Sequence, residues 1–169
     1  MRIPTQNEST TAGEREARHV LRVYYEDTDF SGFVYHASYL RFLERARTEW
    51  LRAIGFEQRE LKHGAALTFA LRRLQINYLR PATMDDVLIV GTRIRRTRGA
   101  SIDFVQTIVR GDEKIIEATV SVALLKSGRP ARIPPAMRAR LLQAAEPGES
   151  AAKESEAADL QGPIESRGQ

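Results

Sequence analysis

The stretch of sequence that decides the fold reads Tyr24-Tyr25-Glu26-Asp27-Thr28-Asp29-Phe30-Ser31-Gly32-Phe33-Val34-Tyr35-His36-Ala37-Ser38-Tyr39-Leu40. Its acidic part, Glu26 to Asp29, interrupts an extended segment, and a glycine, aromatic residues and a histidine follow before a helical pattern begins. This order places a carboxylate near a helix N-terminus. Free backbone N–H groups and the positive end of the helix dipole can hold an oxygen that gains charge there.

The sequence predicts one long helix from about His36 to Ile54. Its apolar residues fall on one broad face at 3.6 residues per turn, and Gly55 is placed to end it. Arg47 stands inside this face and needs a polar partner. A helix this apolar requires a sheet that wraps around it. The apolar positions are Tyr39, Leu40, Phe42, Leu43, Ala46, Trp50, Leu51, Ala53 and Ile54.

Five segments have the composition and alternation of β-strands, and a change of phase near Arg72 and Arg73 indicates a β-bulge. The segments are residues 19–25, 66–79, 87–98, 101–110 and 115–126. No crossover helix separates the last four, so the sheet is predicted to be antiparallel. The sequence therefore predicts an α+β fold, one long central helix wrapped by a five-stranded antiparallel sheet. A second copy of the chain would cover the sheet edge that this arrangement leaves open.

The two ends of the chain differ in composition from the middle. Residues 1–18 predict a disordered arm, residues 19–135 one domain, residues 136–145 a short helix and residues 146–169 a disordered acidic tail. The chain has a net charge of +4, but the tail carries −4 and the first 18 residues are neutral, which leaves about +8 on the rest. A basic body favours a polyanionic partner such as a phosphorylated cofactor, a nucleic acid or an anionic membrane.

Composition also limits the chemistry. With no cysteine, the chain has no disulfide, thiolate zinc site or cysteine nucleophile, and it suits a reducing compartment. The polar N-terminal residues and the lack of a long apolar run predict a cytoplasmic protein without a membrane segment. His19, His36 and His63 are too widely spaced for a metal-ligand motif, so no metal is expected.

Four motifs then resemble a known family. These are Tyr24 to Asp29, then Gly32, then Val34 to Tyr39, and finally Glu44 to Glu49. Together they resemble the YbgC-like acyl-CoA thioesterases, hot-dog-fold enzymes of the 4-hydroxybenzoyl-CoA thioesterase group that are often encoded beside the Tol–Pal envelope system. The similarity extends over roughly residues 19–135 in the same order of elements.

The resemblance implies that Asp29 is the catalytic carboxylate and that the backbone N–H of His36 holds the thioester oxygen. Asp29 either attacks the carbonyl carbon or draws a proton from water, and the sequence leaves both roles open. His36 can also act through its side chain, or simply open the helix. Phe30 and Ser31 replace smaller residues that the family often has before Gly32, and a phenylalanine there can narrow the acyl pocket.

Further residues are predicted to bind the substrate. Gly32 belongs to the matching motif, Tyr35 can line the acyl pocket, and Glu44 either positions water or pairs with Arg41 or Arg47. Basic residues near the ends of two strands suit the phosphates of coenzyme A, with a solvated strand edge as the alternative interpretation. These are Arg96, Arg98, Arg129 and Arg132.

The leading hypothesis is an acyl-CoA thioesterase that acts on short aliphatic or aromatic acyl groups as a homodimer or homotetramer, with no cofactor besides the coenzyme A of its substrate. One alternative is a hydratase or dehydratase on the same fold. Another is a non-catalytic acyl-CoA- or acyl-carrier-binding partner of the envelope system. Nucleic-acid binding is not expected, because no aromatic surface accompanies the arginines.

Overall fold

The computed structural model describes residues 16–145. The disorder predicted for residues 1–15 and 146–169 lies outside this range. Residues 17 and 18, assigned to the disordered arm by the sequence, belong instead to the first strand, β1 (Ala17–Arg22). They pair with Thr92 and Gly91, and this pairing extends the strand backwards from His19.

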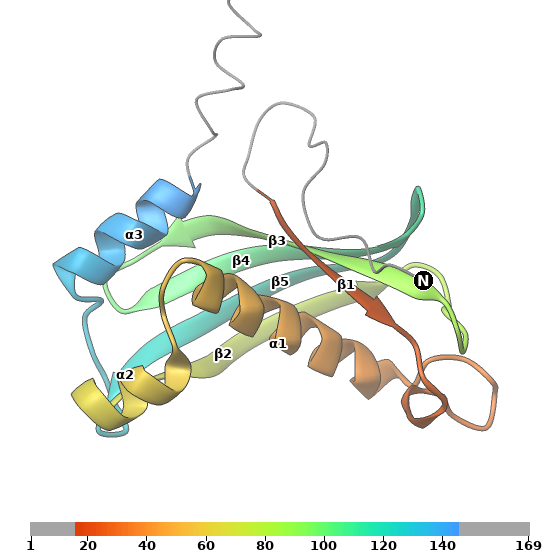
Figure 1. Ribbon diagram of the computed structural model, residues 1–169, viewed down its shortest axis with the longest axis horizontal. Coiled ribbons are helices and arrows are strands. Elements are labelled where there is room, and N and C mark those ends of the chain that lie inside the picture. Colours follow the sequence, from red (N-terminus) through yellow and green to blue (C-terminus); the bar gives the residue numbers. More distant parts are fainter. Residues whose placement is uncertain (1–15, 146–169) are drawn as a thin grey trace, which may run out of the picture.

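A single antiparallel sheet curls around the central helix (Figure 1). Its path is β1-β3-β4-β5-β2, and a two-residue strand, β6, pairs with the end of β5. The predicted bulge is confirmed, because the β2–β5 register shifts between Leu71 and Arg73. The remaining bounds are β2 (Leu67–Tyr78), β3 (Val87–Thr97), β4 (Ser101–Arg110), β5 (Glu113–Lys126) and β6 (Arg129–Pro130).

The central helix, α1 (His36–Ala53), buries most of the face that the sequence predicts, but Leu40 and Ala53 of that face are exposed. It ends in a Schellman motif: the Gly55 N–H donates to the Arg52 carbonyl at 2.9 Å and the Phe56 N–H to the Leu51 carbonyl at 2.9 Å. Gly55 adopts φ +86°, which a residue without a side chain adopts readily. Trp50 packs edge-to-face on Phe104 of β4, with ring centroids 5.4 Å apart.

Two local predictions need correction. The first strand stops at Arg22, because the Asp27 carboxylate binds the Tyr24 N–H and folds Tyr25–Asp27 into a 3₁₀ turn, η1. Helix α2 (Gln58–Ala65) has no counterpart in the sequence-based interpretation. It has eight residues and one large apolar side chain, the partly buried Leu61, which is too short a pattern to predict a helix. A third helix, α3 (Pro135–Ala145), lies over β3 and buries Met137 and Leu141.

The interface between α1 and the sheet contains one polar cluster. Gln106 of β4 is fully buried; its Oε1 accepts a hydrogen bond from Arg47 at 2.8 Å. Its Nε2 donates to Thr92 Oγ1 at 2.8 Å and to the Leu43 carbonyl at 3.0 Å. Gln106 is thus the partner that Arg47 requires. Burial lowers the pKa of the Arg47 guanidinium, and the nearby Glu44 offsets part of that effect.

Candidate active site

The loop before α1 is fixed to the helix by Asp27. This carboxylate is only 3% exposed and accepts a hydrogen bond from the Tyr24 N–H at 3.0 Å. Arg41 of α1 forms an ion pair with it at 3.5 Å, and Ser38 Oγ donates to the Asp27 carbonyl at 3.0 Å. Asp27 therefore has a structural position, although the sequence alone does not separate it from its acidic neighbours.

Asp29 lies two residues further on and is exposed. One of its oxygens, Oδ1, accepts hydrogen bonds from the Ser31 N–H at 2.8 Å and from the Ser31 hydroxyl. These bonds, the hydroxyl one first, lower the pKa of Asp29, and the nearby His36 contributes in the same direction. Asp29 is therefore an ionised carboxylate, carried by the loop that leads into α1.

The turn that carries Asp29 depends on Gly32. The Gly32 N–H donates to the Asp29 carbonyl and the Asp29 N–H to the Phe33 carbonyl, both at 3.0 Å. Gly32 has φ +81°, a conformation strained for residues with a side chain. Gly32 therefore shapes the turn around Asp29, and its predicted role in substrate binding stays a prediction.

His36 opens α1, as predicted, and its carbonyl accepts a hydrogen bond from Tyr78 at 3.2 Å. Tyr35 is the N-cap residue, but its side chain makes no capping hydrogen bond. Within residues 16–145, neither the His36 N–H nor the Ala37 N–H donates a hydrogen bond to the chain. Two backbone donors at the positive end of an 18-residue helix are therefore available to an anionic oxygen.

A pocket of about 310 Å³ adjoins this helix end. Tyr39 is buried at its base, where the phenol oxygen accepts a hydrogen bond from the Ala82 N–H at 3.1 Å. Burial raises the pKa of Tyr39, so the phenol stays neutral. The lining is mainly apolar: Val34, His36, Tyr39, Tyr78, Leu79, Arg80 and Pro81. Among sequence-predicted site residues, only His36 is part of it.

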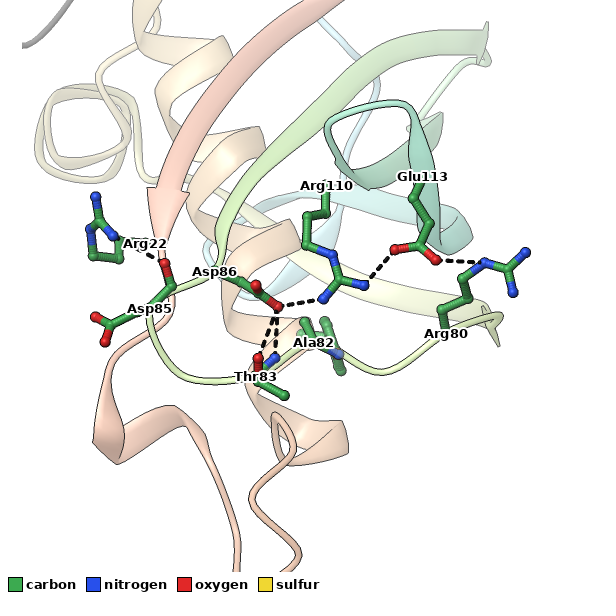
Figure 2. A network of polar contacts seen from close by, with 9 residues as sticks. Arg22, Arg80, Ala82, Thr83, Asp85, Asp86, Arg110 and Glu113 are labelled. Carbon is green, nitrogen blue, oxygen red and sulfur yellow. Dashed lines mark hydrogen bonds and ion pairs between the residues drawn. The ribbon is translucent and has the colours of Figure 1, made fainter.

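The loop between β2 and β3 forms the other wall of the pocket, and a chain of ion pairs supports it (Figure 2). Arg110 bonds both Asp86, at 2.6 Å, and Glu113, and Glu113 in turn pairs with Arg80 at 2.9 Å. Burial alone would raise the pKa of Asp86. The Thr83 N–H, at 2.8 Å, and Arg110 outweigh burial and hold it below its usual value.

This loop is also tied to the site. The Val34 N–H donates to the Ala82 carbonyl at 2.8 Å, and Phe33 forms a β-bridge with Thr83. The predicted strand ends at residue 79, so Arg80 and Pro81 fall just outside it and have no predicted role. No spacing rule relates them to His36, because the two segments meet only through the sheet's curvature.

Three predicted side chains lie elsewhere. Phe30 is fully exposed and does not line the pocket, so it does not narrow it within one chain. Tyr35 is also exposed and stacks at a tilt on His36, with ring centroids 4.3 Å apart. Glu44 accepts a hydrogen bond from Thr48 at 2.8 Å, while its expected partners Arg41 and Arg47 bond Asp27 and Gln106.

The four arginines predicted to bind phosphate gather at the opposite end of the sheet from Asp29. Arg96 lies near the end of β3 and Arg98 directly after it, and Arg129 lies in β6, three residues before Arg132. All four are exposed, and Arg98 pairs with Asp103 at 3.4 Å. In Figure 1 this end lies beside α3, whereas the loop before α1 lies at the other side. The 11 residues of β3 separate the two ends by roughly 35 Å.

In the part of the chain that the structure describes, no three His, Cys, Asp or Glu side chains form a cluster able to hold a metal ion. No helix within residues 16–145 has both the length and the apolar character needed to cross a bilayer.

Comparison with known proteins agrees with this fold. The thioesterase-like superfamily matches residues 23–141. The protein therefore belongs to the thioesterase-like superfamily, and its curled antiparallel sheet around one long helix is the hot-dog fold. The predicted α+β hot-dog class is confirmed.

Individual relatives extend the match. Acyl-CoA thioesterase YbgC of Haemophilus influenzae is 46% identical over 109 residues, which cover 64% of this chain and 80% of that protein. Acyl-CoA thioester hydrolase YbgC of Escherichia coli O157:H7 is 47% identical over 103 residues, covering 60% of this chain and 76% of the relative. The predicted YbgC-like resemblance is thus confirmed.

Solved structures give the same result. A probable thioesterase from Bartonella henselae is 43% identical with a TM-score of 0.69, and the match covers 71% of this chain and all of that one. A thioesterase from Thermus thermophilus, solved with coenzyme A and Zn, is 28% identical with a TM-score of 0.66. That match covers 75% of this chain and 92% of the other.

Proposed function

We propose that the protein is an acyl-CoA thioesterase in which Asp29 and the N-terminus of α1 carry out the hydrolysis. The observation that carries this proposal is an exposed, ionised carboxylate in the loop that leads into α1. The first two N–H groups of that helix have no partner among residues 16–145, and its first residue, His36, lines a small, mainly apolar pocket. The YbgC relatives, which are thioesterases of acyl-CoA by name, support the same reaction.

In this mechanism the acyl group enters the pocket and its carbonyl oxygen points to the N–H groups of His36 and Ala37. Asp29 then attacks the carbonyl carbon, or takes a proton from a water that attacks it. Either way the carbonyl oxygen becomes an anion, and the helix end stabilises that charge. Coenzyme A leaves as the thiolate and is protonated, and water supplies the second oxygen of the free acid.

The nucleotide part of coenzyme A would be bound by a second copy of the chain. Within one chain the arginines lie at the far end of β3, a strand of 11 residues that spans roughly 35 Å. Strand β2 is an open edge, and it exposes Leu71 and Tyr78. Two copies paired antiparallel along β2 would bring the Leu67 end of one strand, next to Lys126 and β6, against the Tyr78 end of the other.

The first experiment measures thiol release from short, long and aromatic acyl-CoAs by the parent and by Asp29→Asn. The variant keeps the size of the side chain but loses its charge, so kcat should fall by about 10²-fold or more. Asp112→Asn is the matched control, since Asp112 is an exposed carboxylate in the β4–β5 turn. Unchanged turnover by Asp29→Asn would remove Asp29 from the mechanism, and no thiol release by the parent would refute the thioesterase.

A mixing experiment tests the shared site. Asp29→Asn and the double variant Arg129→Met/Arg132→Met should each be impaired alone. If the arginines act across the dimer, mixed dimers contain one intact site, and the mixture regains activity well above the mean of its components. Additive activities, or a mass of about 19 kDa by light scattering, would contradict the two-chain site.

A cytoplasmic location is part of the proposal and is consistent with the absence of cysteine.

A further inference from the structure

Arg80 differs from the other side chains around the pocket. Apart from His36, the lining is otherwise made of apolar and aromatic residues and proline. Arg80 is thus the one strongly basic group among the pocket's described lining residues. A mainly apolar pocket with a single charged group is the usual design of a site that recognises one polar atom of its ligand.

The guanidinium of Arg80 is held from one side only. Its Nε pairs with Glu113 Oε1 at 2.9 Å, and within residues 16–145 its two terminal nitrogens have no acceptor. Figure 2 shows these nitrogens pointing away from Glu113. The Nε contact restrains the plane of the group, and the two terminal N–H groups form a fork that fits a carboxylate.

The charges behind Arg80 favour an additional anion. Asp86, Arg110, Glu113 and Arg80 alternate in sign along the chain of contacts. The four charges sum to zero, and Arg80 is the positive end of this chain of contacts. An anion bound to the two terminal nitrogens of Arg80 would place a negative charge next to the last positive charge of this series. Because the Arg80 side chain is 59% exposed, water weakens this attraction, and the effect on binding should be moderate.

From this geometry we infer that Arg80 recognises a carboxylate at the far end of a short acyl chain, and that the preferred substrates are coenzyme A monothioesters of short dicarboxylic acids. The inference rests on the proposed thioesterase function. Arg80 and His36 line the same pocket of about 310 Å³, so a thioester oxygen at His36 leaves room for only a short acyl group before Arg80. The phosphates of coenzyme A lie beyond the pantetheine arm, on the other side of the thioester.

Succinyl-CoA and butyryl-CoA test the inference, because their acyl chains have the same length and differ in the terminal carboxylate. The parent should show a higher kcat/KM for succinyl-CoA. Arg80→Met should reduce the succinyl-to-butyryl ratio of kcat/KM by about tenfold. Arg80→Lys keeps the charge without the fork and should fall between. Arg59→Met, an exposed arginine of α2, should leave the ratio unchanged.

Binding provides a readout that does not depend on catalysis. The thioethers S-(3-carboxypropyl)-CoA and S-butyl-CoA are not hydrolysed, and calorimetry should show the same preference for the carboxylate and the same loss in Arg80→Met. Equal losses for both compounds would assign Arg80 to coenzyme A or to pocket structure and overturn the inference. An unchanged succinyl-to-butyryl ratio in Arg80→Met would also overturn it. Absence of thiol release with an intact binding preference would instead refute only the thioesterase.

Discussion

Two polar clusters lie along α1, and they differ in exposure and in the completeness of their hydrogen bonds. In the middle of the helix, Arg47, Gln106 and Thr92 form a buried group in which Gln106 uses both ends of its amide. At the N-terminus, Asp29 and Ser31 are exposed, and only one carboxylate oxygen is bonded. The first cluster joins the helix to the sheet, whereas the second leaves an oxygen and two N–H groups available.

The difference indicates that the middle of α1 contributes to stability and that its N-terminus contributes to the chemistry. A buried polar group must be bonded, because an unpaired donor or acceptor there costs about 1–3 kcal/mol. An exposed group is solvated without partners and can exchange water for a substrate. We therefore expect substitutions in the middle cluster to change the free energy of unfolding and those at the N-terminus to change the rate.

The largest effect on stability is expected for Gln106→Leu. The change removes the acceptor of the Arg47 guanidinium and leaves that charge half-buried without its partner. Hydrogen bonds to charged groups contribute about 1.5–3 kcal/mol, so the free energy of unfolding should fall by about 2–3 kcal/mol. Urea unfolding followed by circular dichroism measures this change in the free energy of unfolding. Thiol release per folded molecule should stay within about twofold of the parent.

The double variant Arg47→Met/Gln106→Leu is the control for this prediction. It replaces both partners by apolar side chains of similar length, and such replacements are often close to neutral. The double variant should thus recover most of the stability that Gln106→Leu loses. A double variant that is less stable than the single one would show that the cluster stabilises the interface by more than satisfying Arg47.

The same contrast explains what the sequence predicts well. The helix bounds, the Gly55 stop and the bulge near Arg72 depend on periodicity and local geometry, which a linear sequence displays directly. The need of Arg47 for a partner is visible too, but its identity is not, because Gln106 lies 59 positions away. Gln106 occupies an inward position of β4 among apolar residues, and that is the one signal of its role.

The site is predicted less completely than the fold. Asp29 and His36 are close together in sequence and follow from the resemblance to the family. The opposite wall, Tyr78 to Pro81, comes from a distant segment that curvature of the sheet brings to α1. Sequence likewise assigns Asp27 and Asp29 to one acidic turn, although a difference of two positions places one inside the protein and one outside.

Asp27→Ala should have an intermediate effect, and it should lower both the free energy of unfolding and kcat. It removes the acceptor of the partly buried Tyr24 N–H bond and the ion pair with Arg41, whose side chain is half-exposed. We expect a loss of about 1–2 kcal/mol in the free energy of unfolding and a several-fold lower kcat, because the loop that positions Asp29 loosens. Glu26→Ala, at an exposed neighbour, should change neither. Equal effects of the two substitutions would argue against a structural role for Asp27.

The smallest and most specific effect is expected for Ser31→Ala. The Ser31 hydroxyl is the first cause of the lowered pKa of Asp29, and the Ser31 N–H remains in the variant. If ionised Asp29 is required, activity is complete above its pKa and declines as the pH falls through it. Removing the hydroxyl raises that pKa, so the acid limb of kcat/KM should move to higher pH, with little change near neutrality.

Ser31→Thr keeps the hydroxyl and should keep the parent profile, which separates the hydrogen bond from a general change in the loop. Because Asp29 is exposed, unfolding midpoints of all three proteins should coincide at neutral pH. An acid limb that Ser31→Ala leaves in place would mean that a group other than Asp29 controls it. The N-terminus of α1 would then provide the oxyanion donors, but Asp29 would not be the base. The assignment of stability to the Arg47–Gln106–Thr92 cluster would remain, and the assignment of chemistry to the Asp29–Ser31 cluster would not.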